Sequence, residues 1–314
     1  MSLSIGIVGL PNAGKSTLFN ALVKGHLARV ADYPFTTIEP NIGMVEVPDE
    51  RLVKLGVNLN IKKVIPATIK FIDIAGLVKN AHKGEGLGNQ FLGHIREVDA
   101  IIHVLDGFSK NNDPNNAKEI INIELELADI KKPTLYVLNV KEENINKAEG
   151  SLERSGGVPN AKHAVRDRAG VGPRERKATR GDMIVLSAKM EEELTDLSDN
   201  EAKQYLESYG LAQSGLVRLI QESYKLLNLI TFYTLIPYKQ IQAWPILCDA
   251  KAPQAAGKVH TDMERGFIAA EVCHYIDLID SGDWQEAREK GKLRTEGKDY
   301  IVQDGDIVHF KFNV

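Results

Sequence analysis

The stretch GLPNAGKSTLFNAL, residues 9–22, constrains this chain more than any other. It follows the apolar run LSIGIVG and opens an amphipathic segment, so it lies between an expected strand and an expected helix. Gly9, Gly14, Lys15 and Ser16 match the phosphate-loop pattern G-x-x-x-x-G-K-[ST]. In such a loop, successive backbone N–H groups and the N-terminus of the helix surround an anion. We therefore expect a triphosphate site, with Lys15 at the β- and γ-phosphates and the Ser16 hydroxyl on Mg²⁺.

A second motif points to the same chemistry. The run VIPATIKFIDIAGL ends on a D-x-x-G pattern at residues 73–76. The Asp73 carboxylate is expected to hold Mg²⁺ through its water shell, and the Gly76 N–H is expected to contact the γ-phosphate. The loop ADYPFTTIEPN between the two motifs offers a threonine that would close over the metal. We select Thr37, with Thr36 as the competing choice.

The base-reading loop departs from the usual GTPase pattern. The strand-like run PTLYVLNV ends in NVKE, residues 139–142, where GTPases usually carry N-K-x-D. Val140 and Glu142 replace the lysine and the aspartate, and the longer glutamate displaces its oxygens by about one C–C bond, which spoils paired hydrogen bonds to guanine. The residues predict a weakened guanine preference and do not by themselves prove adenine. With LSAK at 186–189 as the last nucleotide loop, the expected nucleotide-binding residues are Pro11, Asn12, Ala13, Gly14, Lys15, Ser16, Thr17, Asn139, Val140, Glu142, Ser187, Ala188 and Lys189.

Composition limits the remaining classes. The formal net charge is −4, so any nucleic-acid surface must be local. Cys248 and Cys273 are too few for a disulfide framework and are not spaced as a metal site. No apolar run approaches the ~20 residues that span a bilayer, and the N-terminus lacks the basic segment of a signal peptide. We expect a cytoplasmic protein.

The order of patterns predicts an α/β fold. Strand-like and helical patterns alternate from Ser4 to Ala188, which favours a mostly parallel sheet with helices on both faces. We expect a P-loop nucleotide-binding domain at 1–229, with an irregular segment at 150–182. Near its end, Ser198 and Glu201 form a capping box, and SGLVRLIQESYKLLNLI carries an apolar stripe.

A second, smaller α+β domain is expected at 230–314. The segment DMERGFIAAEVCHYIDLIDSG contains a helix-like stretch with Phe267 near its start. The segment DYIVQDGDIVHFKFNV predicts a β-hairpin that turns at Asp304 and Gly305. A small mixed sheet wrapped on a helix fits these patterns.

Longer motifs add a resemblance to these local signals. The phosphate loop, YPFTTIEPNIG, DIAGLVKNAHKGEGLGNQFL, APQAAGKVHTDMERGFI and EGKDYIVQDGDIVHFKFNV resemble the YchF/Obg-like ATPase family over most of 1–143 and 182–314. The resemblance implies a G-domain-like P-loop ATPase that binds GTP more weakly than ATP. It also implies association with the ribosome, on its large subunit, and a C-terminal TGS domain of the ubiquitin-like β-grasp type. Asn12 matches the asparagine that helps hold K⁺ in related potassium-activated members.

The TGS resemblance also implies a surface for RNA or protein. Lys251, Lys258, His260 and Arg265 are the basic residues that would contribute to it, although scattered surface charges are the commoner reading.

Hydrolysis is less well specified than binding. Leu77 stands where many GTPases place the glutamine that orients the attacking water. Some family members are thought to use a histidine from the loop after AIIHVLDGF, but here that loop, SKNNDPNNAKE, is short and contains none. His82 and His94 are the nearest candidates, and we select His82, while His103 inside the strand is expected to be a packed core residue. We expect slow hydrolysis that needs K⁺ or a partner.

Two further segments differ from the family pattern. The family's long helical arm is absent, because the chain passes from helix to strand through 131–133. Residues 150–182 are rich in glycine and arginine and are either a basic insert that contacts RNA or a linker, and we favour the linker because no aromatic residues interleave. An ATPase switch is the expected function, with a GTPase of related fold and a scaffold with negligible turnover as alternatives.

Overall fold

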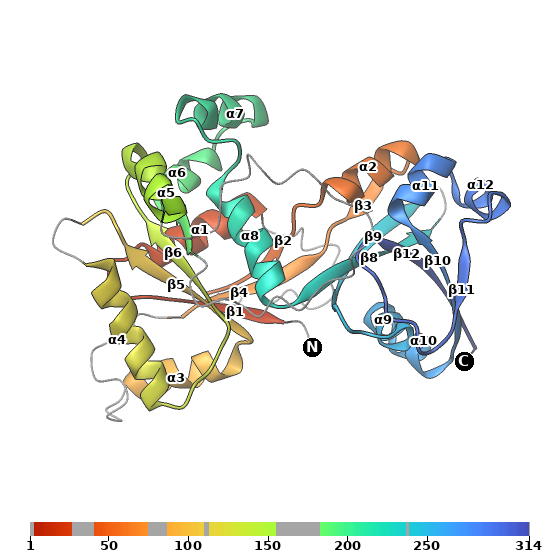
Figure 1. Cartoon of the computed structure of the whole chain (residues 1–314), viewed down its shortest axis with the longest axis horizontal. Coiled ribbons are helices and arrows are strands. Elements are labelled where there is room, and N and C mark those ends of the chain that lie inside the picture. Colours follow the sequence, from red (N-terminus) through yellow and green to blue (C-terminus); the bar gives the residue numbers. More distant parts are fainter. Residues whose placement is uncertain are drawn as a thin grey trace. The chain divides into compact units, whose positions relative to one another are not determined.

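The computed structural model describes residues 3–26, 41–74, 87–109, 113–154, 183–236 and 239–313. Their contacts group into two compact units (Figure 1). The first unit contains the described residues up to 45 and residues 69–226, and the second contains residues 46–68 and the chain from 227 onward. No helix among these described ranges is both long and apolar enough to cross a membrane.

The first unit is built on a six-stranded sheet. Its strand order is β2 (Ile42–Glu46), β4 (Thr68–Asp73), β1 (Ser4–Val8), β5 (Ala100–Asp106), β6 (Thr134–Asn139), β7 (Met183–Leu186). Strands β4, β1, β5, β6 and β7 pair in parallel. Every residue of β1 and β5 is buried, as the apolar runs require of central strands covered on both faces. The predicted α/β fold with a mostly parallel sheet is confirmed.

Helices cover both faces of this sheet. On one face lie α3 (Leu87–Glu97) and α4 (Pro114–Leu127), packed on a core that includes Val8, Phe91 and Ile121. The other face carries α1 (Lys15–His26), α5 (Ile145–Arg154), α6 (Ala188–Leu194) and α8 (Gly215–Leu226) (Figure 1). The carboxyl ends of the parallel strands therefore meet at one edge of the sheet, where α/β proteins bind ligands.

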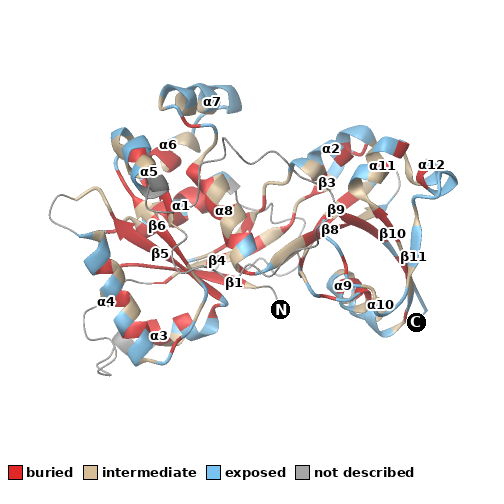
Figure 2. Ribbon diagram, in the orientation of Figure 1, coloured by how far each residue is buried: buried red, intermediate tan, exposed pale blue. Residues whose placement is uncertain are grey.

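Two helix predictions in this unit are confirmed. Helix α7 (Asp199–Ser208) begins with the predicted capping box, in which the Ser198 N–H donates to Glu201 Oε2 at 3.0 Å. The predicted stripe of α8 is buried (Figure 2), and it consists of Leu216, Leu219, Ile220 and Tyr224, with Leu227 just beyond the helix.

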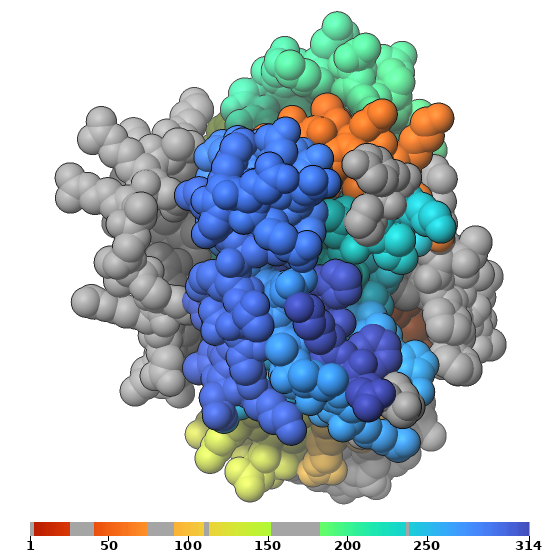
Figure 3. All heavy atoms as spheres, turned by 90° about the vertical axis from the view of Figure 1, so that its right-hand side faces the viewer, coloured from red at the N-terminus to blue at the C-terminus, as the bar shows by residue number. Residues whose placement is uncertain are grey.

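The second unit has its own six-stranded sheet. Its order is β11 (Arg294–Glu296), β10 (Phe267–His274), β12 (Asp306–Phe312), β8 (Leu229–Ile236), β9 (Gln240–Leu247), β3 (Lys63–Ile65). The pairs β12–β8 and β3–β9 are parallel, whereas β11–β10, β10–β12 and β8–β9 are antiparallel. Figure 3 shows the face of this unit that is formed mainly by residues after 250. Its helices are α2 (Glu50–Asn58), α9 (Ala252–Val259), α10 (Thr261–Arg265), α11 (Tyr275–Ser281) and α12 (Trp284–Glu289).

Residues 46–68 differ from the expected division of the chain. The sequence placed them in the nucleotide-binding domain, but α2 and β3 contact the C-terminal sheet instead. The Arg51 guanidinium pairs with Asp49 at 2.9 Å and with Asp304 at 2.6 Å, and the Tyr233 hydroxyl donates to Asp49. Burial alone would raise the pKa of Asp49, but the hydrogen bonds and charge of Arg51 lower it. This network fixes α2 to strands that lie some 180 residues further along the chain.

Two local predictions for the C-terminal segment are wrong. Residues 267–274 form strand β10, not a helix, and Phe267, Ala270 and Val272 pack into the core of the second sheet. The turn at Asp304 and Gly305 exists, and Gly305 has a φ of +90°. The segment before it does not form a hairpin with β12, because β12 pairs with β10 and β8 on its two sides. Asp304 instead accepts a hydrogen bond from the Thr231 N–H at 2.9 Å.

Candidate nucleotide-binding site

The phosphate loop runs from the end of β1 to the first turn of α1. Asn12 and Gly14 have φ values of +64° and +90°, in the left-handed region. A Cβ at position 14 would lie 2.2 Å from Asn139 Nδ2, so both the backbone angle and the close approach require glycine there. Left-handed residues that alternate with ordinary ones turn successive N–H groups toward one side, which is the geometry of an anion-binding nest.

Lys15 places a buried cation beneath this loop. Its side chain donates from Nζ to the Leu10 carbonyl at 3.0 Å, and the residue is only 8% exposed. Burial lowers the pKa of Lys15, and the nearby Asp73 carboxylate partly offsets this effect. No described carboxylate lies within ion-pair distance of Nζ, so the positive charge is available to an anionic ligand.

Ser16 and Asp73 meet at the carboxyl ends of β1 and β4. The Ser16 hydroxyl donates to Asp73 Oδ2 at 3.0 Å, and Asp73 Oδ1 is buried with no hydrogen-bond partner in the part of the chain that the structure describes. A hydroxyl beside an unsatisfied carboxylate oxygen fits a small hard cation such as Mg²⁺. Three other predicted residues, Thr37, Gly76 and His82, lie outside the described residues.

Asn139 joins the phosphate loop to the base-side loops. Its Nδ2 donates to the Ala13 carbonyl at 3.0 Å, and its Oδ1 accepts from the Ala188 N–H at 2.9 Å. The side chain is 5% exposed, so both bonds are shielded from water. One buried amide therefore fixes three loops that are far apart in the sequence.

Glu142 begins a short 3₁₀ helix, Glu142–Asn144, immediately after the base loop. Its Oε1 atom is buried and makes no hydrogen bond to any described residue. The Lys189 ammonium lies 3.9 Å from this oxygen and 3.6 Å from Glu193 Oε1. Glu142 therefore keeps one carboxylate oxygen that is shielded from solvent and has unused acceptor capacity.

Residues of the phosphate loop, the base loop and the 187–189 loop line one pocket of about 710 Å³, a volume typical of small-molecule sites, and Asp73 is not among its lining residues. Of the thirteen predicted nucleotide-binding residues, the pocket includes all except Pro11, which is exposed, and Ala13, which is buried behind the loop. The sequence reasoning missed Phe108 and Lys141. The lining consists of Asn12, Gly14, Lys15, Ser16, Thr17, Phe108, Asn139, Val140, Lys141, Glu142, Ser187, Ala188 and Lys189.

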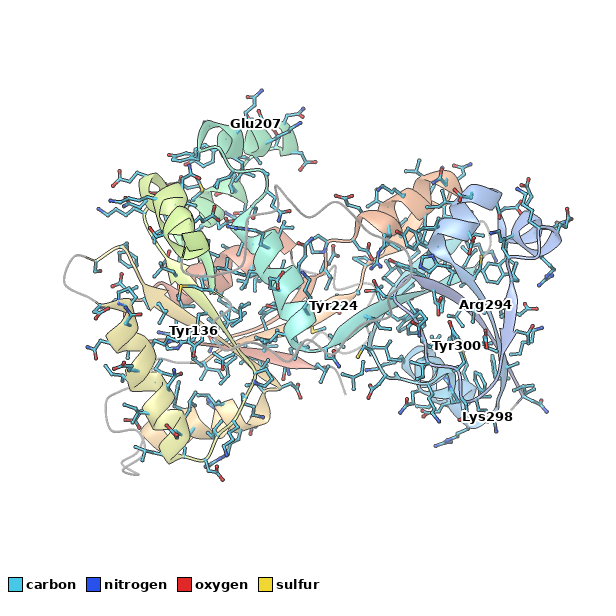
Figure 4. All side chains as sticks on the ribbon, in the orientation of Figure 1. Tyr136, Glu207, Tyr224, Arg294, Lys298 and Tyr300 are labelled. Carbon is cyan, nitrogen blue, oxygen red and sulfur yellow. The ribbon has the colours of Figure 1, made fainter. Side chains whose placement is uncertain are left out.

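The described histidines do not complete a catalytic group. His103 is fully buried in β5, as expected of a core residue, and its ring packs beside that of Tyr136. Figure 4 labels Tyr136 on β6. Burial, with smaller effects of Lys118 and Lys15, lowers the pKa of His103 to about 3. His94 is exposed on α3 and does not line the pocket.

The fold and this pocket define a P-loop nucleotide-binding protein of the GTPase fold. Residues 4–140 match a family model described as "50S ribosome-binding GTPase", and residues 229–313 match a YchF C-terminal model described as "Protein of unknown function (DUF933)". The ribosome-binding ATPases YchF of Bacillus subtilis and Escherichia coli O157:H7 are each 40% identical to the chain, with all of both sequences covered. The solved YchF GTPase of Schizosaccharomyces pombe is 29% identical, covers 99% of this chain and 98% of its own, and gives a TM-score of 0.78. The chain belongs to the YchF family.

Proposed function

We propose that this protein binds ATP with Mg²⁺, hydrolyses it slowly, and works as a nucleotide-dependent switch on the ribosome in the cytoplasm. The observation that carries the proposal is the pocket that joins the phosphate loop to a base loop ending in Glu142. Full-length similarity to proteins named ribosome-binding ATPases supports the same reading.

We assign the phosphate end of the site as follows. Lys15 contacts the β- and γ-phosphates from beneath the loop, and Ser16 and Asp73 hold Mg²⁺ together with Thr37. Bound Mg²⁺ would neutralise charge on the phosphates. The Gly76 N–H contacts the γ-phosphate, and His82 orients the attacking water, while Asn12 contributes to a K⁺ site. Single-turnover hydrolysis by His82→Ala at the parent rate would exclude His82 from this role.

The ATP preference is argued from the base end. Adenine lacks the paired N1–H and N2–H donors that an aspartate in N-K-x-D accepts from guanine, and Glu142 offers its oxygens from a longer arm. Competition of ATP and GTP for a fluorescent nucleotide tests the assignment, and tighter GTP binding would contradict it.

A GTPase of the same fold is the second candidate, and one observation favours it. Glu142 Oε1 is a buried acceptor without a hydrogen-bond partner among the described residues, and a guanine N–H would satisfy it. The same competition experiment separates the two candidates.

Ribosome contact is proposed to involve the second unit, as a TGS-type module at 230–314. Two of its four candidate basic residues are already engaged, because Lys251 pairs with Asp299 at 2.7 Å and His260 accepts a hydrogen bond from the Asp262 N–H. Lys258 and Arg265 are exposed. Co-sedimentation with ribosomes, in the presence of ATP or of ADP, tests the association. If the protein is missing from the ribosome pellet with both nucleotides, the association is rejected. Phosphate release in K⁺ against Na⁺, with and without ribosomes, tests whether the partner and the cation complete the site.

A further inference from the structure

Hydrogen bonds to Asp106 and to Asn139 hold the short turn after β5, residues 107–109. Asp106 ends the strand, is 5% exposed, and lies opposite Asn139 in the register of β5 and β6. Its Oδ1 accepts hydrogen bonds from the N–H groups of Phe108 and Ser109, both at 3.0 Å. The intervening Gly107 N–H donates to the Asn139 carbonyl at 2.8 Å. The backbone N–H groups of residues 107–109 therefore donate three hydrogen bonds, two to the Asp106 carboxylate and one to the Asn139 carbonyl.

This turn carries the one aromatic side chain among the described residues that line the pocket, Phe108. A Cβ at Gly107 would lie 2.8 Å from Leu138 Cδ1 and 3.0 Å from Val140 Cγ1, so the turn packs directly against the base loop. A flat apolar ring that lines the same pocket as the buried Val140 provides a surface that matches the face of a nucleobase.

We propose that Asp106 is a positioning residue for the nucleobase: its carboxylate locks the 107–109 turn so that Phe108 is held ready at the base end of the pocket. The inference rests on the proposed nucleotide-binding function. Its physical basis is preorganisation, because a loop and a side chain that are already ordered cost less to immobilise when the ligand binds. Without the Asp106 acceptor, the turn and the Phe108 side chain would have to become ordered when the nucleotide binds, and this cost would weaken nucleotide affinity.

The test compares a ligand that has a base with one that lacks it. Dissociation constants are measured for ATP and for inorganic tripolyphosphate, each with Mg²⁺, by calorimetry on the full chain. Asp106→Ala should weaken ATP binding roughly fivefold to tenfold, the cost of ordering one side chain and its loop. It should leave tripolyphosphate binding unchanged, because the hydrogen bonds that Asp106 Oδ1 accepts come from the 107–109 turn and not from the phosphate loop, and the bonds of Asn139 to both segments remain. Asp106→Asn keeps an oxygen acceptor at the same place and should restore ATP affinity.

A double-mutant cycle and a matched control separate positioning from general stability. If Asp106 acts through Phe108, Asp106→Ala should add nothing to the loss of ATP affinity already caused by Phe108→Ala. Asp113→Ala removes a similar bond, which the Asn115 N–H donates to Asp113 Oδ1 at 2.9 Å, in the same unit but not among the residues that line the pocket. This control should lower stability without changing either dissociation constant.

Three outcomes overturn the inference: ATP affinity of Asp106→Ala equal to the parent, an equal loss for tripolyphosphate, or a full further loss in the Phe108→Ala background. If Asp106→Ala does not fold by circular dichroism, Asp106→Ser, which keeps one acceptor on a shorter arm, takes its place with the same two ligands. Failure of the parent chain to bind ATP would refute the proposed function instead, so the two failures are distinguishable.

Discussion

The buried imidazole of His103 makes the first unit sensitive to acid. The folded chain holds the pKa of His103 at about 3, against 6.5 for the unperturbed side chain. Between these values the unfolded chain binds a proton that the folded chain does not, so the free energy of unfolding falls as the pH drops below 6.5. Integrating this difference from pH 7 to pH 5 gives a loss of about 2 kcal/mol, or roughly a 25-fold increase in the population of the opened state.

Hydrogen exchange of the β5 amides measures this loss where it arises. The quantity to compare is the change in protection between pH 7 and pH 5 in the parent and in His103→Phe, which keeps a ring but cannot titrate. The parent should lose roughly 25-fold more protection than the variant, since all other titrating groups are shared and cancel. His94→Gln, which alters an exposed histidine of the same unit, should behave as the parent. Equal pH dependence in the parent and His103→Phe would refute the reasoning.

Further predictions concern the pocket and the second unit. Gly14→Ala places a Cβ 2.2 Å from Asn139 Nδ2 in a left-handed backbone, and it should weaken ATP binding at least roughly 30-fold by calorimetry; near-parental affinity would contradict the close approach. Glu142→Asp should shift the ratio of GTP to ATP affinity toward GTP by roughly tenfold in nucleotide competition, and an unchanged ratio would remove Glu142 as the discriminating residue. Arg51→Leu leaves the carboxylates of Asp49 and Asp304 without their cation and should lower the free energy of unfolding by about 2–3 kcal/mol. Urea unfolding followed by tryptophan fluorescence measures this loss, since both tryptophans lie in the second unit. Glu50→Ala, which breaks only an exposed pair on the same helix, should cost less than about 0.5 kcal/mol, and equal costs for the two variants would contradict the network.

The phosphate end of the site could be predicted from the sequence because its chemistry is local. The residues from Asn12 to Thr17 form one loop and one helix start, so their spacing alone brings their backbone N–H groups together. Asn139 and Ala188 are distant in the chain, but Asn139 ends strand β6 and Ala188 lies just after strand β7, and such neighbouring parallel strands end at the same edge of the sheet. The pocket brings these predicted segments together.

Phe108 could not be found in this way. Its place depends on the turn that Asp106 and Asn139 impose, and no spacing rule singles out an aromatic residue two positions after a strand. A useful signal was an aspartate at a strand end followed by glycine, which favours a turn whose backbone donates to the side chain.

The division of the chain into units needed contacts that sequence patterns do not contain. Strand and helix signals at 46–68 are real, but periodicity says nothing about which sheet a strand joins, and β3 pairs with β9, some 175 residues away. Residues 267–274 illustrate the same limit, because their pattern fits either a helix or a half-buried strand. Pairing with β12 on one side and β11 on the other decides for the strand.

The central claim is that the phosphate loop, with its buried Lys15, and an altered base loop together make an ATP site. The most direct measurement is displacement of a fluorescent nucleotide by ATP and by GTP, with Mg²⁺, from the parent chain and from Lys15→Ala. The account predicts that ATP displaces the probe from the parent at lower concentration than GTP, and that Lys15→Ala does not bind the probe. Displacement by GTP at lower concentration, or parental binding by Lys15→Ala, would contradict it.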